Sequence, residues 1–529
     1  MKNTNVLIKE MKLLVYDVNP YVKLLNNASR TVNEFYSPLY EYEVNERIFP
    51  ESVILKKMIV EDVYEFYGKS KADLIKSRLD NHFMAETATH YSFPKSFDNF
   101  YGIDFDSNLT WNAYIISVAM AKRYGQSVHF GIYVTDIPFS SANSPSVIEI
   151  TPEISTRIHL SGDISRCVEW YNLENDKIDL CIKKLKELTK ASLLSDLEKV
   201  LNDKKNEISA KTINRLKSDN VSLETTLEVL KEANASRDVM KKFTEILTEI
   251  NSISDSFNRD ASDFFSRTIN VHKKLFDDLI NSDRLGVEQI TLSNQTIIKF
   301  FIAQLRDKES WWFRVFNNPG ILTKFVEELA DVRSGWSKIK TDDSYYMTSP
   351  FHRIIHNAKK TLVTTPNFDL KEYKPEVLAG ELENRELTPT CAMLIVIYLS
   401  VGFLPVGGPL QSMYAKEIQK KFCTFLYGIN EVEKADEVKG IPVEISLHTA
   451  AFDCKDNMGL YNYSDLKEMH DLMPDIIDKI PEMNLKHAHM NALPTLYNFY
   501  SHYVVGRNHP DFRRCIINQS KEEFLEDIL

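Results

Sequence analysis

The most apolar run of the chain is Cys391–Leu399, where every residue is apolar or aromatic. Such a run predicts a helix buried on all sides, because none of its faces is polar. Thr388 can cap this helix and Pro389 suits its first turn, since the N–H that proline lacks would have no partner there. The run ends near Leu404, short of the roughly 20 residues that a bilayer span needs. We therefore expect a core helix and no membrane-spanning segment.

A second helix is predicted from about Leu410 to Gly428, because apolar residues recur on one stripe at helical spacing and a glycine ends it. Between the two helices lies the corner Gly407-Gly408-Pro409. Such a corner either packs backbone against backbone or lets backbone N–H groups approach a ligand. Gly407 and Gly408 are therefore candidates for contact with a cofactor or substrate.

Residues 1–165 mix helical and strand-like patterns. The run Val128–Thr135 predicts a strand, and apolar residues at helical spacing between 111 and 119 predict a helix that stops at Gly125. A helix, a turn and a strand in succession indicate a small α/β domain.

Residues 166–300 are predicted to form a helical hairpin or bundle. Amphipathic periodicity continues with little interruption from Cys181 to Ile280, with lysine and glutamate on the opposite faces. Ser222 and Ser236 can serve as N-caps of two of these helices. A region of this kind can dock a partner protein or support its neighbours.

Residues 301–529 are predicted to form a mainly helical core domain with a short strand pair. The aromatic segment from Trp311 to Phe316 needs burial in a core, and Arg314 within it can stack or pair. Ile441–Thr449 alternates strictly between apolar and polar residues, which predicts a strand. We therefore expect a predominantly α protein with a smaller α/β part, α+β overall, in which a helical bundle core follows an N-terminal mixed domain.

Composition supports the helical prediction, and charge limits the classes of partner. The 529 residues include 16 glycines and 19 prolines, few for that length, which favours helix over turns. The net charge of -11 argues against a nucleic-acid binder, because phosphate neutralisation needs a basic face. Scattered cysteines without a C-x-x-C pair are typical of a reducing compartment. The start of the chain lacks the apolar core of a signal peptide, so we expect a cytoplasmic protein.

His82, Glu86 and His90 recur at spacings of four in the sequence NHFMAETATHY. On a helix these side chains lie along one face, where two imidazole nitrogens and a carboxylate oxygen can reach one metal ion. The alternative is a solvated helix face. These three residues form the first candidate metal site.

His352 and His356 stand four apart in a segment that Ser349 and Pro350 are predicted to open as a helix. In the first turn, the positive end of the helix dipole would keep the His352 imidazole neutral, as a ligand must be. The pair is the second candidate metal site, and a third ligand would have to come from elsewhere in the chain.

The C-terminal segment LPTLYNFYSHYVVGRNH predicts a helix with Leu496, Tyr500 and Val504 on one stripe and His502 near its middle. A single histidine on such a helix is either a core or boundary residue or a ligand.

Three segments of the C-terminal third occur in an order that resembles the indoleamine 2,3-dioxygenase family of haem enzymes: GGPLQSMYAKEIQKKFCTFLYGI, EMHDLMPDIID and LYNFYSHYVV. The family carries a glycine-rich loop leading into a helix, then a Tyr-Met-Pro segment, then a helix whose histidine ligates haem iron. The resemblance implies His502 as axial ligand and Gly407 and Gly408 beside the substrate or a propionate. Ile477 stands where the family has a histidine, and a simple alignment places Tyr500 at the iron-ligand position.

Three hypotheses of function follow. The first is an oxidoreductase with histidine-held iron, as haem or as a bare metal ion, acting on a small substrate, for which an aromatic compound is one candidate. The second is a non-catalytic, α-rich interaction protein of a pathogen, phage or defence system, whose helical middle region binds a protein partner. A third hypothesis is an α-rich transferase or hydrolase, for which no G-x-S-x-G, H-E-x-x-H or G-x-G-x-x-G motif is present.

Overall fold

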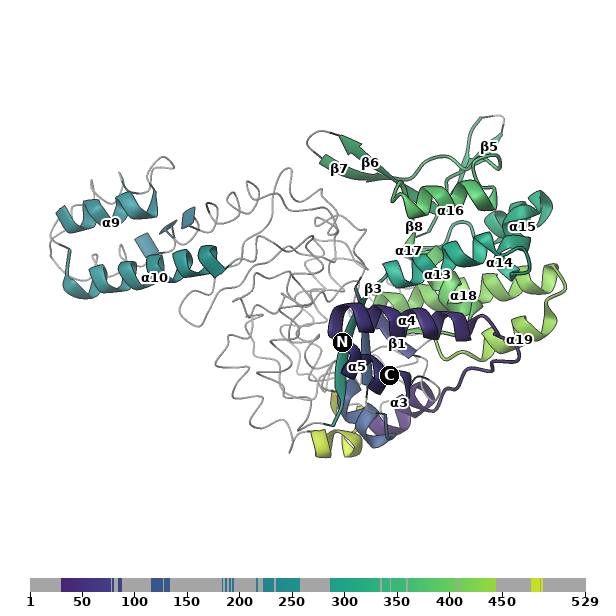
Figure 1. Cartoon of the computed structure of the whole chain (residues 1–529), viewed down its shortest axis with the longest axis horizontal. Coiled ribbons are helices and arrows are strands. Elements are labelled where there is room, and N and C mark those ends of the chain that lie inside the picture. The colour runs from purple at the N-terminus through teal and green to yellow at the C-terminus, as the bar shows by residue number, and fades with distance from the viewer. Residues whose placement is uncertain are drawn as a thin grey trace, which may run out of the picture.

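The structure is a computed structural model of the chain, and its described residues form a helical body around a small parallel sheet (Figure 1). Predominantly helical architecture with a small sheet part confirms the predicted fold class. The description covers residues 30–77, 79, 84–87, 116–126, 128–133, 183, 186–187, 190–191, 193–194, 216, 222–232, 235–256, 286–333, 335–342, 344–357, 360–406, 409–443, 477–485 and 487–488.

The elements lie in the following order along the chain. The helices are α3 (Val32–Tyr40), α4 (Ser52–Tyr67), α5 (Lys69–Lys76), α9 (Leu223–Glu232), α10 (Arg237–Ser256), α13 (Gln295–Arg306), α14 (Trp311–Asn317), α15 (Pro319–Glu328), α16 (Pro375–Glu383), α17 (Cys391–Ser400), α18 (Pro409–Gly428), α19 (Val432–Gly440) and the 3-10 helix η3 (Ile480–Glu482). The strands are β1 (Met84–Thr87), β2 (Val128–Tyr133), β3 (Glu288–Ser293), β4 (Lys338–Lys340), β5 (Tyr345–Met347), β6 (Phe351–Asn357), β7 (Lys360–Thr364), β8 (Leu387–Pro389) and β9 (Leu404–Val406).

The central sheet is parallel, with strand order β3-β2-β1-β9. The predicted strand at Val128 is confirmed as β2, in which the successive residues Phe130, Gly131 and Ile132 are all buried. Burial on both faces is the usual condition of a parallel sheet. The strands come from all three of the regions distinguished in the sequence, whose division into domains stays a prediction.

Residues 116–123 are helical and end at the glycine predicted to stop them. The N–H of Gln126 donates to the carbonyl of Ala121 at 2.7 Å, and that of Gly125 to Lys122 at 3.1 Å. This bond pattern is a Schellman cap, which requires a left-handed residue just beyond the helix. Gly125, with φ of 69°, supplies that conformation without a Cβ clash.

Helix α17 is buried along nearly its whole length, as its sequence predicts. The side chain of Thr390 caps it by accepting from the N–H of Met393 at 3.2 Å. The predicted cap, Thr388, lies instead in β8, opposite His352 of β6, so the cap prediction was wrong by two residues. Among the described helices, none has the length and apolar character needed to cross a bilayer.

The aromatic segment that begins α14 lies in the main core, as expected. Trp312 contacts Phe301 edge to face at 5.0 Å between ring centroids, and Phe325 at 5.9 Å. Both tryptophans of the segment are buried. Arg314, between them and Phe316 in sequence, pairs with Glu431 before α19.

Two contacts hold α4 and α19 in place. Asp62 of α4 accepts hydrogen bonds from Thr296 and from Lys299 Nζ, the latter at 3.0 Å, which fixes α4 against α13. Gln419 of α18 donates to the carbonyls of Val438 and Ile441 at 2.6 and 2.8 Å, which fixes the end of α19. Both helices are therefore anchored to the main core.

The predicted helix beginning at Pro350 is wrong, because residues 351–357 form strand β6. That strand pairs antiparallel with β7 on one side and β8 on the other, so its backbone groups bond to neighbouring strands. In a strand, positions four apart lie about 13 Å from each other. The helical spacing argument that joined His352 to His356 therefore fails.

The predicted helix face through residues 82–90 is also wrong at its centre, because Glu86 lies in β1 and pairs with Gly131 and Val406 of the neighbouring strands. His82 and His90 lie outside the described residues. Of the predicted strand Ile441–Thr449, residues 444–449 also lie outside them.

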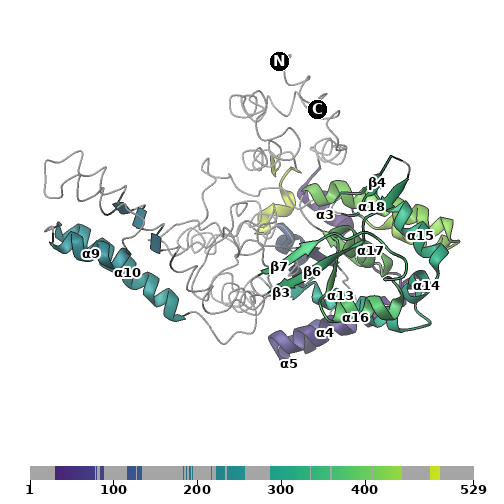
Figure 2. The same ribbon diagram turned by 90° about the horizontal axis from the view of Figure 1, so that it is seen from above.

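Helices α9 and α10 lie away from the helical body in both views (Figures 1 and 2). Both predicted caps are confirmed: Ser222 Oγ accepts from the N–H of Thr225 at 3.1 Å, and Ser236 Oγ from that of Val239 at 3.4 Å. Their buried apolar residues Leu223, Leu230 and Phe243 are not members of the main core cluster, and neither are the buried residues Leu193, Leu194 and Leu216 that precede them in the chain. We call α9 and α10 the helical arm.

Candidate functional site

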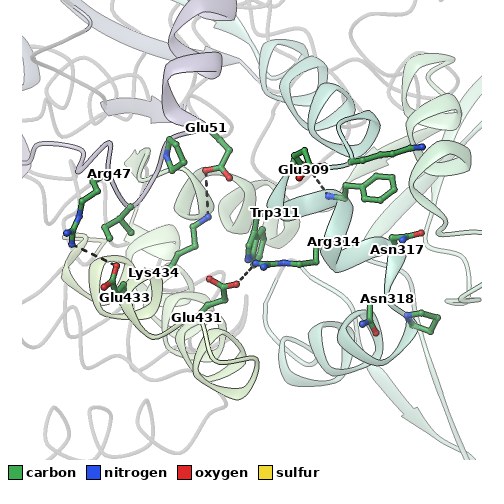
Figure 3. Close-up of a pocket in the computed structure, with 16 residues that line it drawn as sticks. Arg47, Glu51, Glu309, Trp311, Arg314, Asn317, Asn318, Glu431, Glu433 and Lys434 are labelled. Carbon is green, nitrogen blue, oxygen red and sulfur yellow. Dashed lines mark hydrogen bonds and ion pairs between the residues drawn. The ribbon is translucent and has the colours of Figure 1, made fainter.

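A pocket of about 850 Å³ opens on the helical body where three stretches of chain meet (Figure 3). Its walls come from residues 47–51 before α4, residues 308–319 around α14 and the start of α15, and residues 431–434 at the start of α19. Its size lies within the range of small-molecule sites. We call it the Lys434 pocket after its most buried charged side chain.

Lys434 lies in the first turn of α19 with only 7 % of its surface exposed. Its Nζ atom is 4.8 Å from the ring centroid of Trp311 and 5.7 Å from that of Phe49, in cation–π contact. Its ion-pair partner is Glu51, whose Oε2 lies 3.9 Å away, as Figure 3 shows. That distance exceeds a hydrogen bond, so the two groups attract each other without direct contact.

Burial lowers the pKa of Lys434 below that of an ordinary lysine. Glu51 and Glu431 offset part of this effect, and Arg314 adds to it. The position in the first turn of α19 acts in the same direction, because the positive end of a helix disfavours a cation. A larger fraction of this amine is therefore neutral than on an exposed lysine, and a neutral amine is a nucleophile.

Glu51 is the N-cap residue of α4, but its side chain makes no capping hydrogen bond. Its Oε2 atom is buried and has no hydrogen-bond partner. A buried carboxylate oxygen without a partner is costly, and the positive end of α4 offsets only part of that cost. The oxygen can therefore accept a hydrogen bond from a molecule that enters the pocket.

The N-terminus of α19 is a further polar feature of the pocket. Glu431, its N-cap residue, makes no capping bond and pairs instead with Arg314. By contrast, Asn318 Oδ1 caps α15 at the same pocket by accepting from the N–H groups of Gly320 and Ile321 at 3.0 and 3.2 Å. An uncapped helix start beside an arginine favours a negatively charged group.

Trp311 forms the apolar wall of the pocket. Its ring meets that of Trp312 edge to face at 4.6 Å, and its indole Nε1 is buried without a hydrogen-bond partner. The pocket thus combines an amine that can act as a nucleophile, a carboxylate that can act as an acid or base, and an aromatic wall.

The histidine sites predicted from sequence are not brought together in the described part of the chain. His82, His90, His502, Gly407 and Gly408 lie outside it, the last two between the end of β9 and the start of α18. Nδ1 of His352 is hydrogen-bonded to Thr365 Oγ1 at 2.8 Å. Among the described residues, no group of three histidine, cysteine or acidic side chains could hold a metal ion.

The Lys434 pocket was not predicted, because the segment EVEKADEVKG is charged and is typical of a solvated helix. One signal was present. Lys434, Val438 and Ile441 follow each other at spacings of four and three, so the lysine continues an apolar stripe. A lysine on the buried stripe of a helix needs either a partner or a function.

Comparison with protein-family models, with curated proteins and with solved structures finds no match to this chain.

Proposed function

We propose that the protein binds a small organic acid in the Lys434 pocket and acts on it chemically. The observation that carries this proposal is the buried amine of Lys434, which lies 3.9 Å from a carboxylate oxygen of Glu51 that accepts no hydrogen bond, in a pocket of small-molecule size. A polar group of a ligand can form hydrogen bonds with both atoms.

The other charged side chains of the lining are three basic and three acidic residues, so binding of an acid would depend on two of the basic ones, Arg314 and Arg47. Arg314 and the uncapped start of α19 can hold a carboxylate or phosphate if Glu431 gives up its place. Arg47 can contribute as well, since its pair with Glu433 is almost fully exposed and therefore weak.

The competing explanation is a structural ion pair that ties α4 to α19. Thermal-shift and calorimetric measurements with small carboxylates, 2-oxo acids and phosphate monoesters distinguish the two. We expect an acid to stabilise the protein and Lys434→Met or Arg314→Gln to abolish that effect. Arg306→Gln is the matched control, because Arg306 forms an ion pair of the same type with Glu383 outside the pocket. If no acid binds, the ion pair is structural.

Histidine-ligated iron, as haem or as a non-haem centre, stays a proposal for this chain, supported by the order of the C-terminal motifs. An absorption spectrum and metal analysis of purified protein test it, and His502→Ala should remove a Soret band. A cytoplasmic location is proposed together with it.

The helical arm supports a second proposed role, the binding of a protein partner. Its buried apolar residues lie outside the main core cluster, and its exposed face carries Lys241 and Lys242. Full-length protein with both lysines changed to glutamate should lose a partner captured by the unaltered protein.

A further inference from the structure

We propose that Lys434 forms a covalent imine with a small acid that also carries a carbonyl group, of the 2-oxo acid class, and that Glu51 moves the protons. This inference rests on the proposed function, because the acid must first bind in the Lys434 pocket. It goes further by naming the reacting atoms and the class of ligand.

The geometry suits an attacking amine. The backbone at Lys434 is held by the first turn of α19, in which Ala435 N donates to the carbonyl of Glu431 at 3.0 Å. The side chain is confined by the rings of Trp311 and Phe49. A fixed amine against aromatic walls loses little further freedom when it reacts, which lowers the entropic cost of the attack.

Glu51 is placed to move protons during the step. Its Oε2, which has no hydrogen-bond partner, lies 3.9 Å from Nζ, so a ligand oxygen or a water beside the pair can hydrogen-bond to both atoms. The neutral amine attacks the carbonyl carbon, a C–N bond forms, and the carbonyl electron pair moves to oxygen. Glu51 carries one proton from nitrogen to this oxygen, which gives a carbinolamine, and then a second proton from nitrogen to the hydroxyl group, which leaves as water while the nitrogen electron pair forms the C=N bond. Amine and carbonyl thus give imine and water, with no net oxidation and with Glu51 restored.

Arg314 and the uncapped start of α19 would bind the carboxylate of the ligand. Arg314 is more than half exposed and its partner Glu431 is partly exposed, so both side chains can move apart. The carboxylate of a 2-oxo acid is adjacent to its carbonyl carbon. A ligand held by Arg314 through its carboxylate therefore has its carbonyl carbon inside the pocket that Lys434 also lines.

The lowered pKa of Lys434 supports the proposal, because only the neutral amine attacks a carbonyl. Lys434 should therefore react faster near neutral pH than the exposed lysines of the chain.

The experiment is reductive trapping on the full-length protein. Pyruvate or 2-oxoglutarate is added near neutral pH with sodium cyanoborohydride, and peptide mass spectrometry locates the reduced adduct. We expect the adduct on the peptide that contains Lys434, with more labelling there than on any peptide that contains an exposed lysine. Lys434→Arg should keep binding of the acid but lose the adduct, and Glu51→Gln should slow its formation.

Lys56 is the matched internal control. It is as buried as Lys434, with 7 % of its surface exposed, but its Nζ donates to Glu46 Oε1 at 2.7 Å and it does not line the pocket. Equal labelling of Lys56 and Lys434 would overturn the inference. So would binding of the acid without an adduct at Lys434, and in that case the proposed function would still stand. Absence of both binding and adduct overturns both proposals.

Discussion

The indole N–H of Trp312 donates a hydrogen bond to Ser400 Oγ at 3.0 Å, which joins α14 to the last residue of α17. Ser400 in turn donates to the carbonyl of Ile397 at 2.7 Å. The hydroxyl thus uses its proton within its own helix and keeps a lone pair for the indole. Both side chains are buried, so water cannot replace either bond.

Ser400→Ala should lower the free energy of unfolding by about 1–3 kcal/mol, because it leaves the Trp312 N–H buried without an acceptor. Urea denaturation followed by tryptophan fluorescence measures the change. Ser77→Ala is the control, since Ser77 makes the same kind of bond, to the carbonyl of Leu74 at 2.8 Å, on the surface. Equal effects of the two substitutions would show that the indole bond contributes nothing.

Gly402 is predicted to tolerate no side chain. Its φ is 71°, and an added Cβ would lie 2.7 Å from Cδ2 of Phe49. Gly402→Ala should therefore destabilise the protein by on the order of 2–4 kcal/mol, from backbone strain and overpacking together. Gly380→Ala, inside α16 with open space around it, should instead stabilise by about 0.5–1 kcal/mol. Thermal melting of both variants measures the contrast, and a shift of the same sign in both would contradict it.

His352 gives the fold a dependence on pH. Burial lowers its pKa from 6.5 to about 4. Between pH 6.5 and about 4, His352 is mostly protonated in the unfolded chain and mostly neutral in the folded protein. The folded state therefore loses stability as pH falls through this range, and its stability does not depend on this histidine above it. His352→Gln should therefore lose less stability between neutral and acidic pH than the unaltered protein.

Melting temperatures across that range test the prediction for His352. His487→Gln, at an exposed position, is the control for the loss of a histidine. If both variants keep the full acid sensitivity, burial of His352 has no part in it.

The elements that the sequence predicted well are those specified by their own residues. Helix α17 needs only its unbroken apolar run, and the stops and caps at Gly125, Ser222 and Ser236 act within a few residues of their own position. Local backbone bonds of this kind are visible in a short stretch of sequence.

Strand β6 shows where that approach fails. Ser349 and Pro350 form a local signal for a helix start, yet Ser349 Oγ accepts from the N–H of Phe351 at 2.9 Å at the start of a strand. The segment forms a strand because it pairs with β7 and with the distant β8. This pairing cannot be predicted from the sequence of the segment itself.

The Lys434 pocket could not be predicted for the same reason. Glu51, Trp311 and Lys434 are separated by more than a hundred residues each along the chain and meet only through packing of their helices on the main core. The spacing of histidines has no bearing on a lysine whose chemistry arises from burial.

The helical arm offers a last prediction, since its buried residues are not members of the main core cluster. Phe243 of α10 is 2 % exposed. Its replacement by alanine typically costs about 3–5 kcal/mol, which is most of what a small cluster can supply. Phe243→Ala should therefore remove hydrogen-exchange protection from residues 223–256 and leave α17 protected.

Thr248→Ala on the same helix provides the control for this prediction. Thr248 is exposed and bonds only within α10, to the carbonyl of Thr244 at 2.8 Å, so its loss should change exchange little in either part. If Phe243→Ala lowers protection equally in the arm and in α17, the two parts unfold as one unit. A partner bound by the arm would then act on the whole fold, including the start of α19 where Lys434 lies. Loss confined to the arm means that partner binding there leaves the Lys434 pocket unchanged.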